Sequence, residues 1–474
     1  MIFFNTLSGK KEKFVPLEKN KVKIYVCGPT VYNLIHLGNA RPMCVFDVLR
    51  KYLIYRGYEV IFVQNFTDID DKIIKKAEQN KTFFEEVSKK YKKEYIVDAR
   101  GLGISKPDIT PSATDYITEM INFISKLIKK NYAYKTDSGS VYFKTNKFYE
   151  YGKLSGQNLS DLKSDVRIFK NEEKKNATDF ALWKSSKPNE PSWISPWGKG
   201  RPGWHIECST MIKKNLGDTI DIHCGGEDLI FPHHENEIAQ SECCNNKKLA
   251  NYWLHNGFIN IDNKKMSKSL NNFFTVRDLS KKVGYEVLRY LLISVHYRSP
   301  INFSEKIIDQ CKSSLTRLYN CKNFLEKLSC SCQDTPKKSF GNINKDLKEE
   351  LTLCKKRFIE AMNNDLNTAD ALGYLFILTK KINSKIFLNK KVLKSKQTIK
   401  FARNIFEELT DILGILYEKK SCKNPQIEIK KLIEERQKLR EKKDYKTADK
   451  IRKKLDKMGI ILKDTADGAV WENK

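Results

Sequence analysis

Long hydrophobic runs are absent from this chain of 474 residues. No stretch approaches the roughly 18–20 apolar residues of a membrane-spanning helix, so we expect no membrane association. The first residues lack an apolar core followed by a small-residue cleavage site, so we expect no export. Apolar residues still make up 40% of the sequence, too many for general disorder. These features predict a soluble, cytoplasmic protein of three or four domains.

Two common catalytic patterns are also missing. The sequence has no G-x-G-x-x-G, which argues against a standard dinucleotide site, and HHENE lacks the H-E-x-x-H order of a zinc protease. The twelve cysteines are dispersed and include the adjacent Cys243 and Cys244, so we expect reduced thiols rather than a disulfide framework. Histidine is scarce, and all seven lie between His36 and His296. Imidazole chemistry therefore belongs to the first two thirds of the chain.

Acidic residues are too few to balance the basic ones, and the formal net charge is +29. Such an excess favours a polyanionic partner, most often nucleic acid, although a lysine-rich composition without function is the alternative. Residues 1–305 hold 48 basic and 35 acidic groups, whereas the shorter segment 306–474 holds 39 and 23. The charge pattern predicts that the C-terminal part grips a phosphate backbone.

The order of elements predicts an α/β fold. A buried strand at Lys21–Val26, a helix over 36–55 and a strand at Glu59–Gln64 form a βαβ unit, which favours a parallel sheet. The segment 116–195 reads as an insertion, after which 219–223 resumes the strand pattern and a helix runs from 232 to about 243. From about 306 amphipathic helices follow, and a short mixed element, GIILKDTADGAVW, closes the chain.

The first strand–helix junction, CGPTVYNLIHLGNARP, carries His36 and Asn39 one helical turn apart. A helix N-terminus offers free N–H groups and a positive dipole end, which suit phosphate. A helix cap with an incidental histidine is the alternative interpretation. A second segment, KKMSKS at 264–269, puts three lysines and two hydroxyls in six residues. It could wrap a triphosphate, or it could be a solvated basic turn.

A third group of residues suggests a metal site. His233 and Glu237 have i, i+4 spacing on the predicted helix, Cys208 lies upstream in GWHIECS, and Cys27 ends the first strand. Two thiolates, an imidazole and a carboxylate form a plausible zinc shell. Spacing alone does not bring Cys27 to the others, and such a His/Glu pair is also common as a surface contact.

The pair H-L-G-N and K-M-S-K-S, in this order, resembles the signature of class I aminoacyl-tRNA synthetases. Longer stretches are similar to the cysteinyl-tRNA synthetase family and follow its order: NFTDIDDKII, RPGWHIECS, DIHCGGEDLIFPHHENEIAQSE, NGFINIDNKKMSKSLNNFFTVRDL, HYRSPINFS, DLNTADAL and YKTADKIRKKLDKMGIILKDTADGAVW. The resemblance covers nearly the whole chain, and only the insertion around 145–195 and the helical connections match loosely.

The resemblance implies a Rossmann-like parallel-sheet catalytic domain with an insertion, an α-helical bundle, and a small C-terminal mixed α/β domain. The implied boundaries are 1–115 and 196–250 for the catalytic domain, 116–195 for the inserted connective domain, 251–305 for a linking region with the KMSKS loop, 306–420 for a tRNA-binding helical bundle, and 421–474 for an anticodon-binding domain. The implied reaction joins L-cysteine and ATP to cysteinyl-adenylate and then charges the terminal adenosine of tRNA(Cys). A monomer is the family expectation.

The resemblance also assigns residues. One zinc ion per chain would sit on Cys27, Cys208, His233 and Glu237 and take the substrate thiolate, which rejects serine without editing. Cysteine would be bound by Thr67, Trp204, Asp228 and His223, with Asp228 on its ammonium group; His205 and His223 would orient ligands or substrate. ATP, accompanied by Mg²⁺, would be bound by His36, Asn39 and Lys268, and catalysis would use His36, Asn39, Lys265 and Lys268. The family motif ends in histidine where this chain has Asn39, and an asparagine side chain cannot supply an imidazolium there.

Two other functions remain open. A relative of the catalytic half could pass cysteinyl-adenylate to a small amine, although the long C-terminal region argues against this. A nucleic-acid-binding or regulatory protein with a dead active site is the third candidate, but both signature loops and all four candidate ligands are present.

Overall fold

The computed structural model describes residues 1–157, 173–261, 264–265, 274–331, 344–387, 395–418, 432–437, 439–440, 444–457, 460–465 and 468–473. The chain divides into two compact units, Met1–Tyr417 and Glu418–Lys474, which are described separately. Among the described residues, no helix is both long and apolar enough to cross a membrane.

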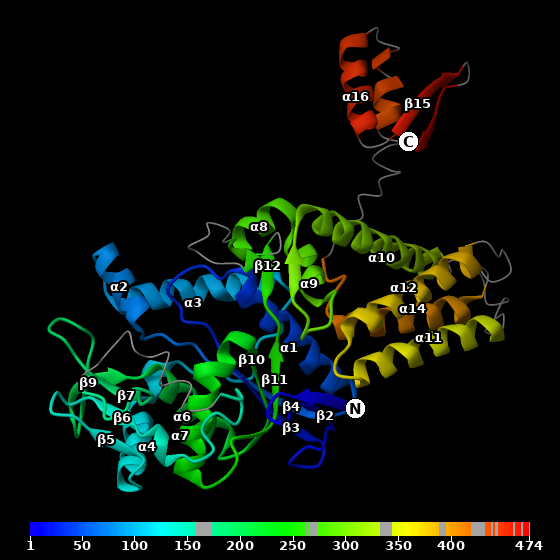
Figure 1. Cartoon of the computed structure of the whole chain (residues 1–474). Helices are drawn as coiled ribbons and strands as arrows, with labels where there is room; N and C mark the ends of the chain where they lie inside the picture. The colour runs from blue at the N-terminus through cyan, green and yellow to red at the C-terminus, as the bar shows by residue number, and fades with distance from the viewer. Residues whose placement is uncertain are drawn as a thin grey trace. The chain divides into compact units, whose positions relative to one another are not determined.

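The centre of the first unit is a four-stranded parallel sheet (Figure 1). Its strand order is β11 (Ala250–Asn256), β10 (Ile220–Gly226), β3 (Lys21–Val26) and β4 (Glu59–Gln64). The predicted βαβ unit is confirmed, because α1 (Leu37–Tyr55) connects the parallel strands β3 and β4.

Helices cover both faces of this sheet, which explains why its strands are apolar on both sides. Val22 and Ile24 of β3 pack in a core with residues of α1, whereas Tyr25 faces the opposite way and packs with α6 (Trp204–Leu216) and α7 (Glu235–Asn245). A π-helical turn, Ile230–His234, leads into α7. The sheet extends beyond residue 250, where the predicted catalytic segment ended, because β11 forms its edge strand. This strand was not predicted from the sequence, because NYWLHN mixes polar and aromatic residues.

The inserted segment forms its own antiparallel sheet with a separate core around Phe143 and Trp183. Its strand order is β5 (Ala133–Lys135), β6 (Val141–Phe143), β7 (Phe180–Ser185), β9 (Gly198–Pro202) and β8 (Trp193–Ser195). This sheet continues past residue 195 to include β9. The predicted helix here is α4 (Ile117–Lys129), which packs into the same core.

Smaller elements surround the sheet. A hairpin of β1 (Ile2–Asn5) and β2 (Lys10–Lys13) begins the chain, and after β4 come α2 (Asp71–Asn80) and α3 (Phe84–Gly101). After β11 the chain forms β12 (Ile259–Ile261), β13 (Lys264–Lys265), α8 (Val276–Val283), α9 (Tyr285–Ile293) and β14 (Ile301–Phe303). Strand β12 pairs with β13 antiparallel and with β14 parallel.

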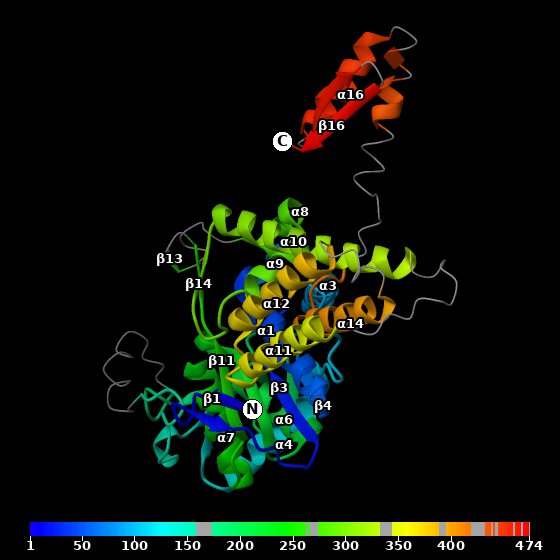
Figure 2. The same ribbon diagram turned by 90° about the vertical axis from the view of Figure 1, so that its right-hand side faces the viewer.

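In the part of the chain that the structure describes, four long helices form the predicted bundle, whose arrangement can be followed in Figure 2. They are α10 (Glu305–Ser331), α11 (Lys345–Asn363), α12 (Thr368–Ile382) and α14 (Lys396–Leu413). Their apolar faces share one core with α1, so the bundle and the parallel sheet belong to the same compact unit. A buried guanidinium reinforces the junction: Arg289 pairs with Asp47 of α1 at 2.6 Å and donates to the carbonyl of Leu413.

The second unit contains α16 (Tyr445–Lys457) and a hairpin of β15 (Ile460–Thr465) and β16 (Gly468–Asn473). Leu432, Ile451 and Leu455 form its small core. The predicted small mixed α/β domain at the end of the chain is therefore confirmed as helix plus hairpin, and the closing segment GIILKDTADGAVW, expected to be a mixed element, supplies the two strands.

Candidate active site at the carboxyl edge of the sheet

The parallel strands all end at one edge, where open α/β sheets bind ligands. A cavity of about 420 Å³ lies there. The structure brings most of the predicted site residues to its walls: Cys27, His36, Asn39, Thr67, Trp204, Cys208, Asp228 and His233. Gly28 is required by close packing at this edge, because a Cβ there would lie 1.6 Å from the carbonyl oxygen of Asn65. The bare backbone lets the loop after β3 press against the end of β4.

The four predicted zinc ligands converge, including Cys27, which spacing alone could not connect to the rest. Their ligand atoms all lie within 4.8 Å of one another. The Cys27 Sγ is 3.8 Å from the Cys208 Sγ and 3.4 Å from Glu237 Oε1. His233 Nε2 is 3.0 Å from the same carboxylate oxygen. Sulfur, imidazole and carboxylate donors thus surround one small volume suited to a metal ion.

The four predicted ligands differ in how their surroundings shift their pKa values. Burial acts to lower the pKa of His233, but the Glu237 carboxylate and a hydrogen bond with Cys208 raise it to about 10. Burial acts to raise the pKa of Glu237, but His223 and His233 hold it well below its usual range. Burial raises the pKa of Cys27, and the neighbouring Cys208 and Glu237 raise it further. Burial also acts to raise the pKa of Cys208, yet hydrogen bonds with Cys27 and His233 lower it to about 6. The pocket therefore stabilises negative charge on Glu237 and Cys208.

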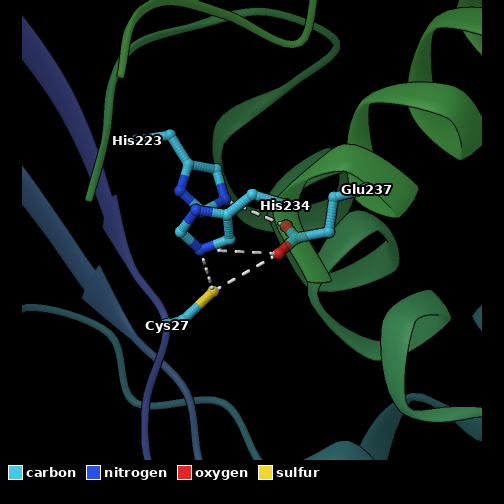
Figure 3. Close-up of side chains that lie close together, drawn as sticks. All are labelled: Cys27, His223, His234 and Glu237. Atoms are coloured by element: carbon cyan, nitrogen blue, oxygen red, sulfur yellow. Dashed lines mark hydrogen bonds and ion pairs between the residues drawn. The ribbon is translucent and has the colours of Figure 1, made fainter. Parts of the chain in front are cut away.

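A second set of donors overlaps the first. Cys27, His223, His234 and Glu237 also hold their ligand atoms within 4.8 Å of one another (Figure 3). His234 Nε2 lies 3.3 Å from the Cys27 Sγ, and its Nδ1 lies 2.8 Å from His255 Nε2. Sequence patterns missed His234 and His255 as contributors. The adjacent histidines of HHENE were the available signal for the first, whereas nothing in β11 marked the second.

His223 does not line the cavity. It is fully buried behind Glu237, with its Nε2 2.9 Å from Glu237 Oε2. His205 Nδ1 similarly lies 2.9 Å from His233 Nδ1. Both contacts match the way histidines and carboxylates beside a metal shell orient the ligands themselves.

The remaining pocket residues line the space in front of the cluster. The Trp204 ring stacks on His233 with centroids 4.2 Å apart and remains 37% exposed. Thr67 Oγ1 donates to Glu207 Oε2 at 2.8 Å. Sequence patterns missed Glu207, whose pKa is raised well above its usual range by burial and by the charge of Cys208. Asp228 sits on a short turn, Glu227–Leu229, directly after β10.

His36 and Asn39 of the first motif, which is expected to bind phosphate, cap the start of α1 through reciprocal hydrogen bonds. The Asn39 backbone N–H donates to His36 Nδ1, and the His36 N–H donates to Asn39 Oδ1, both at 3.3 Å. The cap uses the amide oxygen of Asn39 and leaves its –NH₂ group as a donor. No acidic residue lies in the first turn, so the positive end of the helix dipole is not neutralised locally.

The second motif, KKMSKS at 264–269, is described only in part. Lys264 and Lys265 form β13, where Lys265 pairs with Asn260 of β12. Lys268 lies outside the described residues.

Comparisons with known proteins cover almost the whole chain. Residues 13–313 match the family described as the catalytic domain of class I (C) tRNA synthetases. Residues 357–417 match the DALR domain, and residues 427–471 match the anticodon binding domain of cysteinyl-tRNA ligase.

Individual proteins show the same likeness. The chain is 50% identical over 472 residues to the cysteine–tRNA ligase of Clostridioides difficile (strain 630), and the match covers 100% of each chain. The methionyl-tRNA synthetase of Mycobacterium tuberculosis with bound methionyl-adenylate has a TM-score of 0.63 at 13% identity, covering 83% of this chain and 92% of that one. The LeuRS–tRNA–LeuAMS complex of Agrobacterium radiobacter K84 has a TM-score of 0.61 at 9% identity, covering 85% of each. Both structures support the fold alone.

Proposed function

Because this chain belongs to the cysteine–tRNA ligase family of class I tRNA synthetases, we propose that it activates L-cysteine with ATP and transfers the cysteinyl group to tRNA(Cys). One observation carries the proposal: a single cavity is lined both by Cys27, Cys208 and His233 of the donor cluster and by a helix N-terminus suited to phosphate. The amino acid and the nucleotide can therefore meet in one space, as adenylate formation requires.

The donor set fits zinc. Cys27, Cys208, His233 and Glu237 supply two sulfurs, one nitrogen and one oxygen within 4.8 Å of one another, which is a common zinc shell. Buried His223 behind Glu237 would hold that carboxylate in place. When bound, the ion supplies a position that takes a thiolate strongly and a hydroxyl poorly, which favours cysteine over serine.

The residues on the cavity wall support the rest of the proposed cysteine site. Asp228 supplies a carboxylate for the ammonium group of the substrate, and Thr67 and Trp204 close the pocket around its body. Trp204 is suited to this role because its ring rests on His233 while more than a third of it remains accessible.

Nucleotide binding involves the other part of the cavity. The α1 N-terminus and the side chains of His36 and Asn39 contact the phosphates of ATP, and Mg²⁺ accompanies them. Lys265 and Lys268 then stabilise the charge that develops on pyrophosphate as it leaves. Adenylate formation is a direct displacement at phosphorus, so positioning and charge stabilisation suffice without a nucleophilic side chain.

The C-terminal regions support tRNA as the acceptor of the cysteinyl group. We assign tRNA contacts to the helical bundle and anticodon reading to the second unit, whose sequence matches the anticodon binding domain of the family. The excess of basic residues after 306 supports a grip on the phosphate backbone. The ligase that charges a small amine is not favoured, because it would have no use for an anticodon domain.

Cysteine-dependent exchange of pyrophosphate into ATP, followed by transfer of cysteine to tRNA(Cys), tests the proposal. Zinc-loaded protein is expected to do both. Absence of exchange would refute adenylate formation, and exchange without transfer to tRNA would support the amine ligase instead. A monomer is expected by size-exclusion chromatography with light scattering.

A further inference from the structure

Arg41 is a buried guanidinium beside the nucleotide part of the cavity that none of the proposed steps uses. It lies on α1, two residues after Asn39, and its side chain is fully buried. Among the described residues, no carboxylate lies within ion-pair distance of Arg41. By contrast, Arg289, which is equally buried, pairs with Asp47 at 2.6 Å. An unpaired buried charge is expensive, so the hydrogen bonds of Arg41 must compensate for its desolvation.

Those hydrogen bonds go to four backbone carbonyls on two separate segments. Nη1 donates to the carbonyls of Gly257 at 2.7 Å and Phe258 at 2.9 Å. Nη2 donates to the carbonyls of His296 at 3.3 Å and Ser299 at 2.5 Å. Burial lowers the pKa of Arg41 to about 10, and the charge of Glu227 acts in the opposite direction. The group therefore remains cationic at neutral pH, and each carbonyl accepts a charge-assisted bond.

Both segments lead to the lysine motif or support it. Gly257 and Phe258 line the cavity and run directly into β12, which continues to β13 and the KMSKS sequence. The second segment runs into β14, the parallel partner of β12. Further along, the Val276 N–H donates to the carbonyl of Ile35 at 2.9 Å, next to His36. The chain is thus attached to the first motif both before and after the lysine motif.

We propose that Arg41 is a positioning residue for adenylate formation, which sets the distance between the phosphate-binding end of α1 and the strand that carries the lysine motif. The inference rests on the proposed function. Arg41 acts through the carbonyls of Gly257 and Phe258 and does not contact the substrate. Its planar fork spans two pairs of carbonyls at once, which the single ammonium of lysine cannot do.

Loss of the Arg41 side chain is expected to impair the use of ATP and not the binding of cysteine. Loss of the fork lets β12 and β13 shift relative to His36 and Asn39, and errors near 1 Å are costly in a reaction catalysed by positioning. The cysteine side of the cavity does not depend on Arg41, because Cys27 directly follows β3, and Cys208 and His233 belong to α6 and to the turn before α7. A residue that merely stabilised the fold would not separate the two substrates.

The test compares Arg41→Lys with Arg289→Lys in full-length, zinc-loaded protein by pyrophosphate exchange, at a temperature below both unfolding transitions. Arg41→Lys is expected to lower kcat/KM for ATP by about ten- to a hundredfold and to leave KM for cysteine within about twofold. Arg289→Lys controls for the loss of a buried guanidinium; it is expected to lower Tm without changing either KM.

Chemical rescue adds a second readout. In Arg41→Ala, millimolar guanidinium is expected to restore part of the ATP-dependent rate, whereas methylammonium is not. The inference is overturned if Arg41→Lys changes KM for cysteine as much as kcat/KM for ATP, if Arg289→Lys has the same kinetic effect, or if both ions rescue equally. Absence of exchange by the unmutated protein would instead refute the proposed function.

Discussion

Asp47 offers the sharpest test of how the catalytic sheet and the helical bundle hold together. It is 2% exposed and accepts hydrogen bonds from Arg289 at 2.6 Å, Lys51 at 2.5 Å and the Ser105 N–H at 2.9 Å. Arg289 also donates to the carbonyl of Leu413 at the end of α14. Replacing Asp47 by asparagine preserves the shape and removes the charge, which leaves a buried arginine without a counter-ion.

The magnitude has two parts. Breaking a buried ion pair from one side destabilises a protein by about 3–5 kcal/mol. The pH-dependent part follows from the pKa of Asp47, which burial acts to raise but the charges of Arg289 and Lys51 lower from 3.8 to about 2. That difference corresponds to about 2 kcal/mol in the free energy of unfolding. Because the folded-state pKa lies below the unfolded one, this contribution is present above about pH 4 and is lost as the pH falls through 2.

Urea unfolding followed by circular dichroism measures both parts. At pH 7, Asp47→Asn is expected to lower the free energy of unfolding of the first unit by about 3–5 kcal/mol. Between pH 5 and pH 2, the unmutated protein is expected to lose about 2 kcal/mol more than the variant. Asp309→Asn is the matched control, because Asp309 is 73% exposed and its pair with Lys312 should contribute less than about 1 kcal/mol. Equal effects of the two substitutions, or parallel pH profiles for Asp47→Asn and the parent, would refute the reasoning.

Three other predictions concern the active site. Cys208→Ser is expected to lose zinc and the selectivity for cysteine over serine together; full zinc occupancy by elemental analysis would show that the ligand set is wrong. Lys268→Ala is expected to slow pyrophosphate exchange much more than it weakens cysteine binding, and an unchanged exchange rate would reject its assigned role. Asn39→Asp keeps an oxygen for the His36 N–H but replaces the amide donor by a negative charge. Tm should therefore stay the same while exchange falls by about tenfold or more, and retained exchange would exclude a phosphate contact by Asn39.

Local patterns were sufficient for the first βαβ unit. The apolar run of β3 and the helix that begins after His36 predicted elements that the structure confirms almost residue for residue. The same patterns failed at β11, where alternating aromatic and polar residues resemble neither a buried strand nor a helix, although most of the strand is buried. Burial there comes from the neighbouring β10 and the N-terminal hairpin, which are distant in sequence.

The candidate site shows a similar division. The i, i+4 spacing of His233 and Glu237 predicted their contact, because a helical turn alone brings such side chains together. The positions of His255, Glu207 and Arg41 could not be predicted, because their partners lie on other elements. Thr6, which lies 2.8 Å from His255, is 249 residues away.

The sequence by itself determined the family and both signature motifs, because residue types and short spacings are sufficient to identify them. It assigned the metal ligands only through the family resemblance, because spacing could not connect Cys27 to the others. It also determined that the net charge of +29 is densest after residue 306. Only the tertiary structure decided that Cys27 reaches Cys208 and Glu237, that His223 stands behind a ligand rather than in the cavity, and that Arg41 joins the two motif-bearing segments. The physical reason is that parallel strands converge at one edge of a sheet, and chain order does not determine which side chains meet there.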